Sequence, residues 1–231
     1  PSGRHSTMNL LGLPRAIIVG FTKIHSRKNL YNYMGQAIET YCKRNKKIIN
    51  IGAGGKVKQI LTAQGVQFKE IDIDEDRKPD IVCSVEDMHM FKDNSVDVFF
   101  CMEVLEHVQD PFKAAQEIRR VLKPKGVIIG STPFLFPLHD EPYDYYRYTK
   151  YGLQHLFKAY KQIKLVERNT YFESIYVVAL RLLVIGNKRQ RVIGLLFSPF
   201  FILFLPFALL GSLIFSNKQS TTGYFFIFKK T

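Results

Sequence analysis

The first group of residues that could bind a ligand is a glycine-rich turn at residues 52–55, which follows the apolar run 48–51. A strand that runs into glycines lets a ligand approach the backbone closely, and it leaves free amides at the start of the next helix. Asp72 ends the next apolar run about 20 residues beyond Gly52, where a carboxylate can accept hydrogen bonds from both ribose hydroxyls of a nucleoside. We therefore predict a nucleoside-containing ligand, with Asp72 as the ribose partner and Asp74 as the alternative. A tight structural turn followed by a solvated acidic turn would give the same pattern without a ligand.

The second group lies in a polar, aromatic segment at residues 133–149, directly after another apolar run. It combines His139, Asp140, Asp144 and Arg147 with four tyrosines. Doubly wound α/β folds bind their ligands beyond the carboxyl ends of strands, which is where this segment begins. A histidine among carboxylates suits proton transfer, so we predict His139 as a general base, with Asp144 and Arg147 orienting the substrate. The alternative is a self-contained loop in which Asp144 pairs with Arg147.

The elements that must position these two groups alternate along the chain, as short apolar runs and as segments with helical spacing. The expected strands are residues 46–51, 67–73, 81–82, 96–102, 127–131, 163–168 and 224–228. The expected helices are residues 29–44, 56–64, 111–122, 149–160 and 174–185, with a turn at 124–126. Strands that alternate with helices predict an α/β fold with a Rossmann-like, doubly wound, mostly parallel sheet.

Four successive stretches carry a family resemblance. They are residues 48–55, residues 82–98, residues 101–108 and residues 121–127. In this order and at this spacing they resemble the motifs of class I S-adenosylmethionine-dependent methyltransferases. The Glu-His-Val after the fourth strand and the Leu-Lys-Pro-Lys-Gly before the fifth are the most specific parts. The resemblance implies a methyltransferase enzyme with S-adenosylmethionine as its cofactor.

The resemblance also implies a role for each part of the cofactor site. The glycine-rich turn would line the methionine part, Asp72 would hold the ribose, and residues 84–86 would border the adenine. Met102 and Glu103 would face the methyl donor. The candidate cofactor-binding residues are Asn50, Gly52, Ala53, Gly54, Asp72, Ile73, Ser84, Val85, Glu86, Met102 and Glu103. The sequence departs from the family at Ser84, where an Asp is often found, so the contact to the adenine amino group would be weaker.

The chemistry that this resemblance implies asks little of the protein beyond positioning. A sulfonium methyl group is already electrophilic, so the protein must place a nucleophile in line with the C–S bond. A base is needed only where the acceptor loses a proton, as a hydroxyl does. The His…Pro-x-Asp-Tyr-x-Arg-x-Thr pattern of the second group resembles methyltransferases associated with cell-surface glycans. That resemblance implies a glycan acceptor, and we expect O-methylation.

The composition is strongly basic, with a formal net charge of +13. A basic surface attracts anionic lipid, acidic glycans or nucleic acid. The three cysteines have no paired spacing, so we expect neither a disulfide framework nor a zinc site, and a reducing cytosolic compartment fits. Since no other metal-ligand spacing stands out, we expect no metal.

Residues 192–215 form an uncharged apolar stretch of about 24 residues, which is long enough for one membrane crossing. A single crossing would separate the last strand from its sheet, and basic residues on both flanks favour keeping both ends on the cytoplasmic side. Pro199 and Pro206 interrupt the stretch. We therefore expect a bent hairpin that enters one leaflet, with its basic flanks on an anionic membrane surface at the cytoplasmic face. A dimer interface and a lid over the active site are the alternatives.

These expectations divide the chain into four segments. Residues 1–28 contain a tag remnant before Met8 and an N-terminal segment, residues 29–187 form the methyltransferase domain, residues 188–219 form the membrane-associating insertion, and residues 220–231 form the last strand. The leading hypothesis is a peripheral or monotopic enzyme that methylates a lipid-linked or membrane-proximal glycan and binds no nucleic acid. The alternatives are an RNA or small-molecule methyltransferase and an inactive membrane-bound scaffold. The oligomeric state stays open.

Overall fold

The computed structural model describes residues 15–181, 188–214 and 219–231, and the expected tag remnant lies outside these ranges. The chain forms two compact units. The sheet unit comprises residues 29–134, 138–166 and 224–231, and the helical unit comprises the described parts of residues 1–28, 135–137 and 167–223. The predicted four-segment division of the chain stays a prediction.

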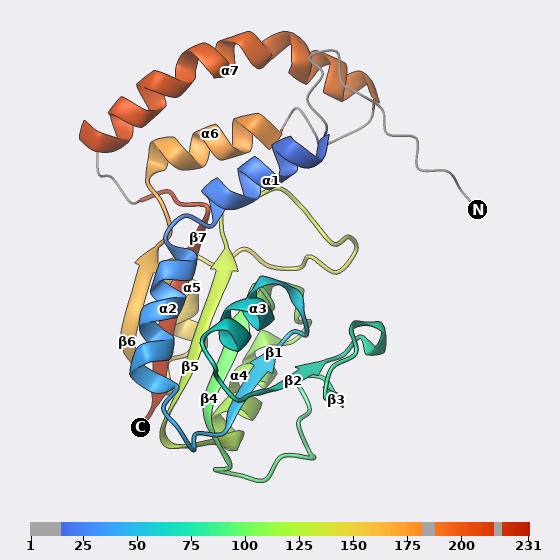
Figure 1. The fold of residues 1–231 in the computed structure, drawn as a ribbon, viewed down its shortest axis with the longest axis vertical. Helices are drawn as coiled ribbons and strands as arrows, with labels where there is room; N and C mark the ends of the chain where they lie inside the picture. The colour runs from blue at the N-terminus through green and yellow to red at the C-terminus, as the bar shows by residue number, and fades with distance from the viewer. Residues whose placement is uncertain (1–14, 182–187, 215–218) are drawn as a thin grey trace. The chain divides into compact units, whose positions relative to one another are not determined.

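The sheet unit is built on seven strands. They are β1 (Ile48–Ile51), β2 (Lys69–Asp72), β3 (Ile81–Val82), β4 (Val96–Met102), β5 (Leu122–Pro133), β6 (Tyr160–Glu167) and β7 (Gly223–Lys230). Their order is β3-β2-β1-β4-β5-β7-β6, and β1 pairs in parallel with both β2 and β4. The last strand, β7, runs to the C-terminus at the end of the sheet opposite to the arrowhead of β5 (Figure 1). This arrangement confirms the predicted Rossmann-like, mostly parallel α/β fold.

Helices cover both faces of this sheet. They are α2 (Leu30–Tyr41), α3 (Gly55–Ala63), α4 (Pro111–Val121) and α5 (Lys150–Leu156), with single 3₁₀ turns η1 (Glu75–Arg77) and η2 (Leu105–His107). Adjacent side chains of a strand point to opposite faces. In β4, Phe99 and Cys101 pack with α4 and α5, whereas Phe100 and Met102 pack with α2 and α3. The continuous apolar run in β4 is therefore explained by burial on both sides.

Two sequence expectations about this unit were wrong in detail. The expected turn at 124–126 lies within β5, where Val96 pairs with Leu122 and Val98 pairs with Val127, so the extra residues form a bulge. The helix expected at 149–160 is shorter in the structure, where α5 ends at Leu156. Tyr160, which was expected to end the helix, is the first residue of β6. The Tyr160 hydroxyl donates to the Ala115 carbonyl at 2.7 Å, which anchors the start of that strand.

The helical unit contains α1 (Arg15–Ser26), α6 (Tyr171–Arg181) and α7 (Lys188–Ile214), and α6 contacts both of the others. A buried network of polar side chains connects segments of this unit that are far apart in the sequence. The Asn169 side-chain oxygen accepts hydrogen bonds from the Ser174 hydroxyl at 3.0 Å, the Thr221 hydroxyl at 2.9 Å and the Thr222 amide at 2.9 Å. This network joins the start of α6 to the residues that precede β7.

The apolar stretch near the C-terminus forms one helix, α7, rather than the expected bent hairpin (Figure 1). Pro199 and Pro206 lie inside this helix. An internal proline removes one backbone hydrogen bond and kinks a helix, and prolines seven residues apart lie on the same face. Both kinks therefore bend α7 in the same direction without reversing the chain. Among the residues that the structure describes, no helix combines the length and the apolar character that a membrane crossing requires.

Asp97, at the start of β4, is expected to make a pH-dependent contribution to stability. Its carboxylate accepts hydrogen bonds from the Lys47 amide at 2.9 Å and from the side chains of Lys123 at 2.7 Å and Lys46 at 3.2 Å. Burial raises the pKa of Asp97, but these hydrogen bonds outweigh burial and hold the pKa below its ordinary value of 3.8. A depressed carboxylate pKa stabilises the fold above the unfolded-state pKa, and this stabilisation is lost as the pH falls through the folded-state pKa.

We expect Asp97→Asn to lower the free energy of unfolding by about 1 kcal/mol at pH 7. The difference between the variant and the wild type should shrink once the pH drops below 3.8. Urea unfolding of both proteins at pH 7 and at a series of acidic pH values measures this difference. A difference that stays the same at all pH values would show that the charge of Asp97 contributes nothing.

Candidate active site

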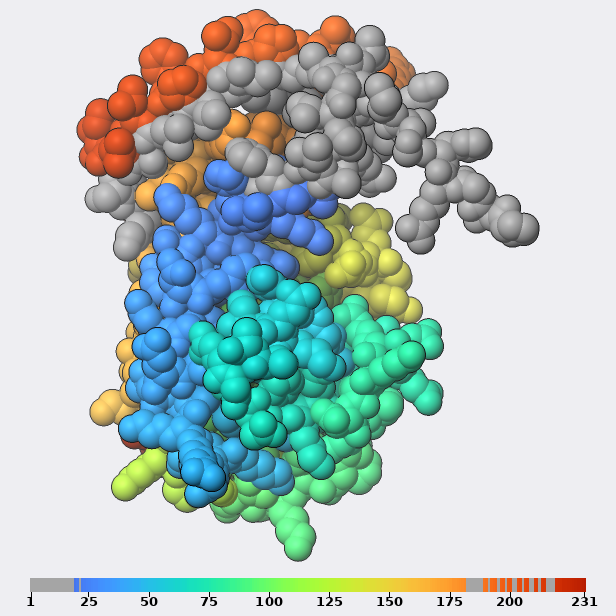
Figure 2. All heavy atoms as spheres, viewed as in Figure 1, coloured from blue at the N-terminus to red at the C-terminus, as the bar shows by residue number. Residues whose placement is uncertain are grey.

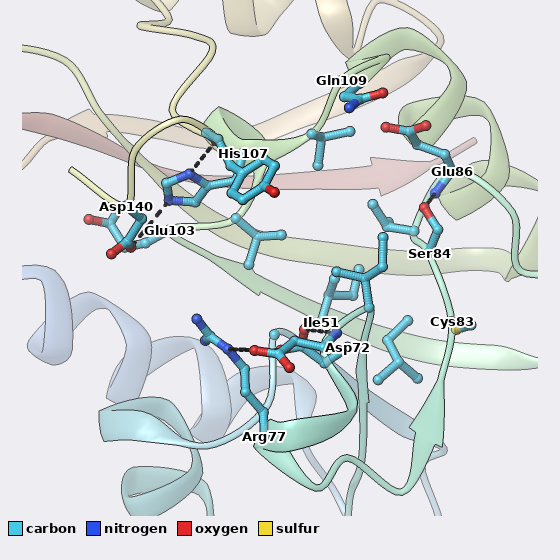
Figure 3. A pocket seen from close by; sticks show the side chains of 18 of the residues that line it. Ile51, Asp72, Arg77, Cys83, Ser84, Glu86, Glu103, His107, Gln109 and Asp140 are labelled. Carbon is cyan, nitrogen blue, oxygen red and sulfur yellow. Dashed lines mark hydrogen bonds and ion pairs between the residues drawn. The ribbon is translucent and has the colours of Figure 1, made fainter. Parts of the chain in front are cut away.

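A cavity of about 610 Å³ opens at the carboxyl ends of β1, β2 and β4 (Figure 3). It is lined by Gly52 after β1, by Asp72 at the end of β2, by Ser84 after β3, and by Glu103 and His107 after β4. This is the position at which the strand order reverses, where doubly wound sheets bind ligands. The volume suits a ligand of nucleoside size.

Gly52 is the residue of the glycine-rich turn that lines the cavity, and two carboxylates accept hydrogen bonds from the amides of this turn. Gly52 and Gly54 have φ angles of 90° and 82°, a region that residues with a Cβ rarely adopt. The Ala53 amide donates to Asp72 Oδ2 at 2.7 Å, and the Gly54 amide donates to Glu70 Oε1 at 3.0 Å. The backbone at this turn is therefore held in a fixed shape that a ligand can approach.

Glu70 is a structural member of the site that the sequence interpretation missed. Its side chain is almost fully buried, it accepts a hydrogen bond from the Asn50 amide nitrogen at 3.1 Å, and its Oε2 lies 2.6 Å from Lys58 Nζ. Asn50 itself is fully buried and also donates to the Gly52 carbonyl at 2.8 Å. Asn50, a candidate cofactor-binding residue, thus stabilises the glycine-rich turn through buried hydrogen bonds to Gly52 and Glu70. A signal was present, because Glu70 and Asp72 share one face of a short strand.

Asp72 and Asp74 have different surroundings, although both line the cavity. Asp72 Oδ1 accepts a hydrogen bond from the Asp74 amide at 2.9 Å, and Arg77 Nε lies 3.9 Å from Oδ2. The carboxylate of Asp74 is turned to cap η1, where it accepts a hydrogen bond from the Asp76 amide at 3.0 Å. Both carboxylates thus already accept backbone hydrogen bonds, and Asp72 stays the predicted ribose partner with Asp74 as the alternative. Ile73, between them, lines the cavity as expected.

The wall formed by Ser84, Val85 and Glu86 faces the cavity on the side away from Glu103 and His107 (Figure 3). The Ser84 hydroxyl accepts a hydrogen bond from the Glu86 amide at 3.1 Å, so it stabilises the local turn. Its role in binding adenine stays a prediction. Glu86 Oε1 in turn accepts a hydrogen bond from the amide that precedes α4 at 3.0 Å.

Glu103 occupies the opposite wall in a strained backbone conformation. Its φ angle is 57°, which is uncommon for a residue other than glycine. Its carboxylate accepts a hydrogen bond from the Ser131 hydroxyl at 3.0 Å, and its amide donates to the Ser131 carbonyl at 2.9 Å. Met102 is buried beneath it at the end of β4. The strand end therefore directs the Glu103 carboxylate at the cavity, as the family resemblance implies.

A second feature, here called the His–carboxylate cluster, consists of Glu106, His107, His139 and Asp144. The two imidazole rings meet edge to face, with centroids 5.0 Å apart. Asp144 Oδ2 lies 3.2 Å from His139 Nδ1 and accepts a hydrogen bond from the His139 amide at 2.9 Å. Of the cluster, His107 lines the cavity. The sequence interpretation found His139 and Asp144 but gave Glu106 no role.

Asp144 is held in the cluster by Arg147, whose two terminal nitrogens lie 2.5 Å from the two carboxylate oxygens. Burial raises the pKa of Asp144, but the hydrogen bonds from Arg147 and from the His139 amide outweigh burial and lower it to about 2. The local brace considered as an alternative is therefore present. It also holds His139 through Asp144, and the predicted role of Asp144 and Arg147 in orienting an acceptor stays a prediction.

The strand order defines a doubly wound α/β fold, and the cavity lies at the switch point where such folds bind their ligands. Residues 49–130 match the family model described as "Methyltransferase domain". Residues 49–130 thus form a methyltransferase domain, for which S-adenosylmethionine is the cofactor. The predicted class, fold and cofactor are confirmed. The individual residue roles stay predictions.

Individual relatives cover different parts of the chain. The human thiol S-methyltransferase TMT1B is 44% identical over 63 residues, which are 27% of this chain and 24% of that protein. A ubiquinone biosynthesis O-methyltransferase from Idiomarina loihiensis is 30% identical over 102 residues, and this chain covers 42% of it. Its counterpart from Vibrio cholerae is 24% identical over 174 residues, which are 67% of this chain and 66% of that protein. The chain thus spans less than half the length of the first two relatives.

Solved structures show the same fold at low sequence identity. A putative sarcosine dimethylglycine methyltransferase from Galdieria sulphuraria superposes with a TM-score of 0.58 at 16% identity, over 88% of this chain and 85% of that one. An S-adenosylmethionine-dependent methyltransferase from Archaeoglobus fulgidus gives a TM-score of 0.54 at 16% identity, over 93% of this chain and 99% of that one. At such identities the likeness extends to the fold alone.

The residues present fit S-adenosylmethionine. A Cβ added at Gly52 would lie 3.0 Å from the Val104 side chain, so this position is kept narrow and free of a side chain. Asp72 offers the carboxylate that a ribose requires, and Val85 and Glu86 form the far wall. The cavity, the glycine turn and the acidic residue therefore agree with the cofactor of the family.

Proposed function

We propose that this chain transfers a methyl group from S-adenosylmethionine to an oxygen atom of a lipid-linked or membrane-proximal acceptor, with a glycan as the first choice. The observation that supports it is the arrangement of the cavity (Figure 3). Asp72 and the glycine turn lie between the wall formed by Ser84 and Glu86 and the opposite wall formed by Glu103 and His107. An acceptor would enter from the side of His107, where the His–carboxylate cluster lies.

The chemistry of this step assigns distinct tasks to the residues of the chain. When bound, S-adenosylmethionine supplies an electrophilic methyl group on a sulfonium sulfur. The acceptor oxygen forms the new C–O bond as the C–S bond breaks, and the electron pair of that bond stays on sulfur. The hydroxyl also loses its proton, which is the task predicted for His139 as a general base. Asp144, held by Arg147, keeps the His139 ring in place.

The choice of oxygen and of a lipid rests on relatives and on the chain's own surface. Two of the relatives are named ubiquinone biosynthesis O-methyltransferases, and ubiquinone is a membrane lipid. The thiol methyltransferase matches over only 63 residues, so it carries less weight for the choice of acceptor. The segment around His139 supports a glycan through its resemblance to glycan-associated methyltransferases.

Radiolabelled S-adenosylmethionine tests this function directly. Purified protein is incubated with a membrane extract, the extract is split into organic and aqueous phases, and Gly52→Arg serves as the control because its side chain fills the cofactor wall. Label that enters the organic phase with the wild-type protein but not with Gly52→Arg supports a lipid-linked acceptor, and label that survives alkali excludes a methyl ester. Label only in the aqueous phase would overturn the lipid part and direct the search to RNA, soluble glycans and small molecules.

We also propose that α7 holds the protein on the cytoplasmic face of an anionic membrane. Exposed apolar side chains follow one another along this helix at intervals of three or four residues. The described atoms of the helix are the orange to red spheres at the top of Figure 2. The exposed side chains include Leu196, Phe200, Leu203, Phe207, Leu210 and Leu213, each more than half exposed. The helix begins with the basic sequence Lys-Arg-Gln-Arg at residues 188–191. An apolar face beside basic residues suits an interfacial helix that lies in the headgroup region.

The double substitution Phe200→Glu with Phe207→Glu should release the protein from membranes. Each phenylalanine contributes on the order of 1.5–3 kcal/mol when buried in lipid, so we expect the bound fraction to fall at least about tenfold. Flotation with vesicles of phosphatidylglycerol and phosphatidylcholine measures it. Phe112→Glu, at a half-exposed phenylalanine of α4, is the matched control and should still float. Wild-type protein that ignores anionic vesicles would contradict the proposal and leave a dimer or lid contact for α7.

A further inference from the structure

We infer that Glu106, His107 and His139 form a binding site for one first-row divalent cation of the Zn²⁺ class. One potential ligand atom from each of these residues lies within 4.8 Å of the others. His107 Nε2 lies 3.8 Å and His139 Nε2 lies 4.0 Å from the same carboxylate oxygen, Glu106 Oε1. Two imidazoles and one carboxylate are the ligand set of catalytic zinc sites that keep a further position open.

The two histidines present the correct nitrogen for this role. His107 Nδ1 lies 2.8 Å from the Tyr143 carbonyl, and a carbonyl can only accept, so the proton of the neutral ring is on Nδ1. The Asp144 carboxylate lies 3.2 Å from His139 Nδ1 and is placed to accept the proton of that nitrogen. In the neutral tautomers that these partners favour, each ring offers the lone pair of Nε2 on the side of Glu106. Ligand histidines in metal sites are oriented by such carbonyl and carboxylate partners.

The charge around the cluster favours a cation. The Glu106 side chain is fully buried, and Arg147 is the guanidinium that interacts with Asp144, Glu106 and Glu103. One guanidinium thus interacts with three carboxyl groups, and a bound cation would add positive charge beside them. Buried carboxylates are costly unless they are paired or coordinate a metal. A divalent cation would supply that coordination.

The geometry has to contract to hold the ion. With ligand bonds of about 2.1 Å, tetrahedral coordination places ligand atoms about 3.4 Å apart. The distances of 3.8 and 4.0 Å to the carboxylate have to contract by a few tenths of an ångström, and the separation between the two imidazole nitrogens, which is at most 4.8 Å, by up to about 1.4 Å. His107 lines the cavity, and Asp140 Oδ2 lies 3.9 Å from His107 Nε2. The open coordination position would be reached from the cavity, or filled by Asp140.

This inference rests on the proposed function and changes how His139 serves it. With the ion in place, His139 and His107 hold the cation rather than taking the proton themselves. A hydroxyl of the acceptor that contacts the cation becomes more acidic, and its proton passes to water as the C–O bond forms. The site would favour acceptors with an oxygen that can contact the cation.

Calorimetric titration of chelator-treated full-length protein with ZnCl₂ and MnCl₂ tests the site without any acceptor. We expect one bound ion per chain and a loss of affinity of more than about 100-fold in His107→Gln and in His139→Gln. Asp144→Asn, which removes an orienting partner, should weaken binding by about 10–100-fold. His89→Gln is the matched control, because His89 is an exposed histidine 3.3 Å from Asp87, and its affinity should be unchanged. Thermal unfolding of each variant without metal identifies any that fail to fold.

Anomalous diffraction at the zinc edge from wild-type crystals supplies a second measurement that needs no variant. A peak between Glu106, His107 and His139 supports the inference, and a peak elsewhere overturns it. Absence of stoichiometric binding, or binding that the His107 and His139 variants retain, also overturns it. Methyl transfer that persists in chelator-treated protein would then leave His139 as the general base. Metal binding without any methyl transfer would instead contradict the proposed function but support the metal site.

Discussion

Asp72→Ala is expected to lower the affinity for S-adenosylhomocysteine at least about 100-fold, which corresponds to about 2.7 kcal/mol. Two losses add up in this variant. The Ala53 amide loses its acceptor at 2.7 Å, so the glycine turn loses its shape. A ribose would also lose the carboxylate that accepts hydrogen bonds from its hydroxyls. Isothermal titration calorimetry with S-adenosylhomocysteine measures the affinity directly.

Two further variants separate these losses. Asp72→Asn keeps an oxygen for the Ala53 amide but removes the charge, so an intermediate affinity would show that the ribose contact matters by itself. Asp74→Ala removes the cap of η1 and should cost about 1 kcal/mol of stability with little change in affinity. If Asp74→Ala abolished binding while Asp72→Ala retained it, the ribose would belong to Asp74.

Gly130→Ala is expected to destabilise the sheet by roughly 3 kcal/mol or more. A Cβ at this position of β5 would lie 2.3 Å from Cζ and 2.5 Å from Cε2 of Phe226, and 2.7 Å from the Cys101 carbonyl oxygen. Phe226 and Cys101 are both fully buried, so neither the ring nor the neighbouring strand has room to move. Urea unfolding at pH 7, followed by circular dichroism, measures the loss.

Coupling with Phe226 tests the physical reason. Phe226→Leu alone should be destabilising because it leaves a cavity, but Gly130→Ala should cost less in the Phe226→Leu background than in the wild type. The contact with the Cys101 carbonyl remains, so the rescue should be partial. A Gly130→Ala protein within about 0.5 kcal/mol of the wild type would show that β5 and β7 are not packed as closely as the structure has them.

The sequence predicted best where local chemistry and burial agree. The strand at 96–102 was predicted with its observed bounds, because a run of apolar residues buried on both faces leaves little choice of structure. The turn at Gly52 was predicted because positive φ angles favour glycine, whereas the ribose role of Asp72 stays a prediction. Glu70 was missed because its role depends on long-range contacts with Asn50 and Gly54.

The errors arose where tertiary structure overrides a local signal. Pro124 and Gly126 are residue types that predict a turn. In the structure these residues belong to β5, where they form a bulge in its pairing with β4. Pro199 and Pro206 predict interruptions of a helix. In the structure both lie inside α7, where a proline bends a helix without ending it. The role of Glu106 could not be foreseen, because only the folded chain brings it within 4.0 Å of His139, 33 positions later in the sequence.

A crystal structure of the protein with S-adenosylhomocysteine tests the central claim most directly. We predict ribose hydroxyls on the Asp72 carboxylate, the adenine against Val85 and Glu86, and the sulfur directed towards Glu103 and His107. Such a placement would leave the acceptor to approach from the His–carboxylate cluster. Density for the ligand outside this cavity, or a cavity that stays empty at saturating ligand, would contradict the assignment of this domain as a methyl-donor site.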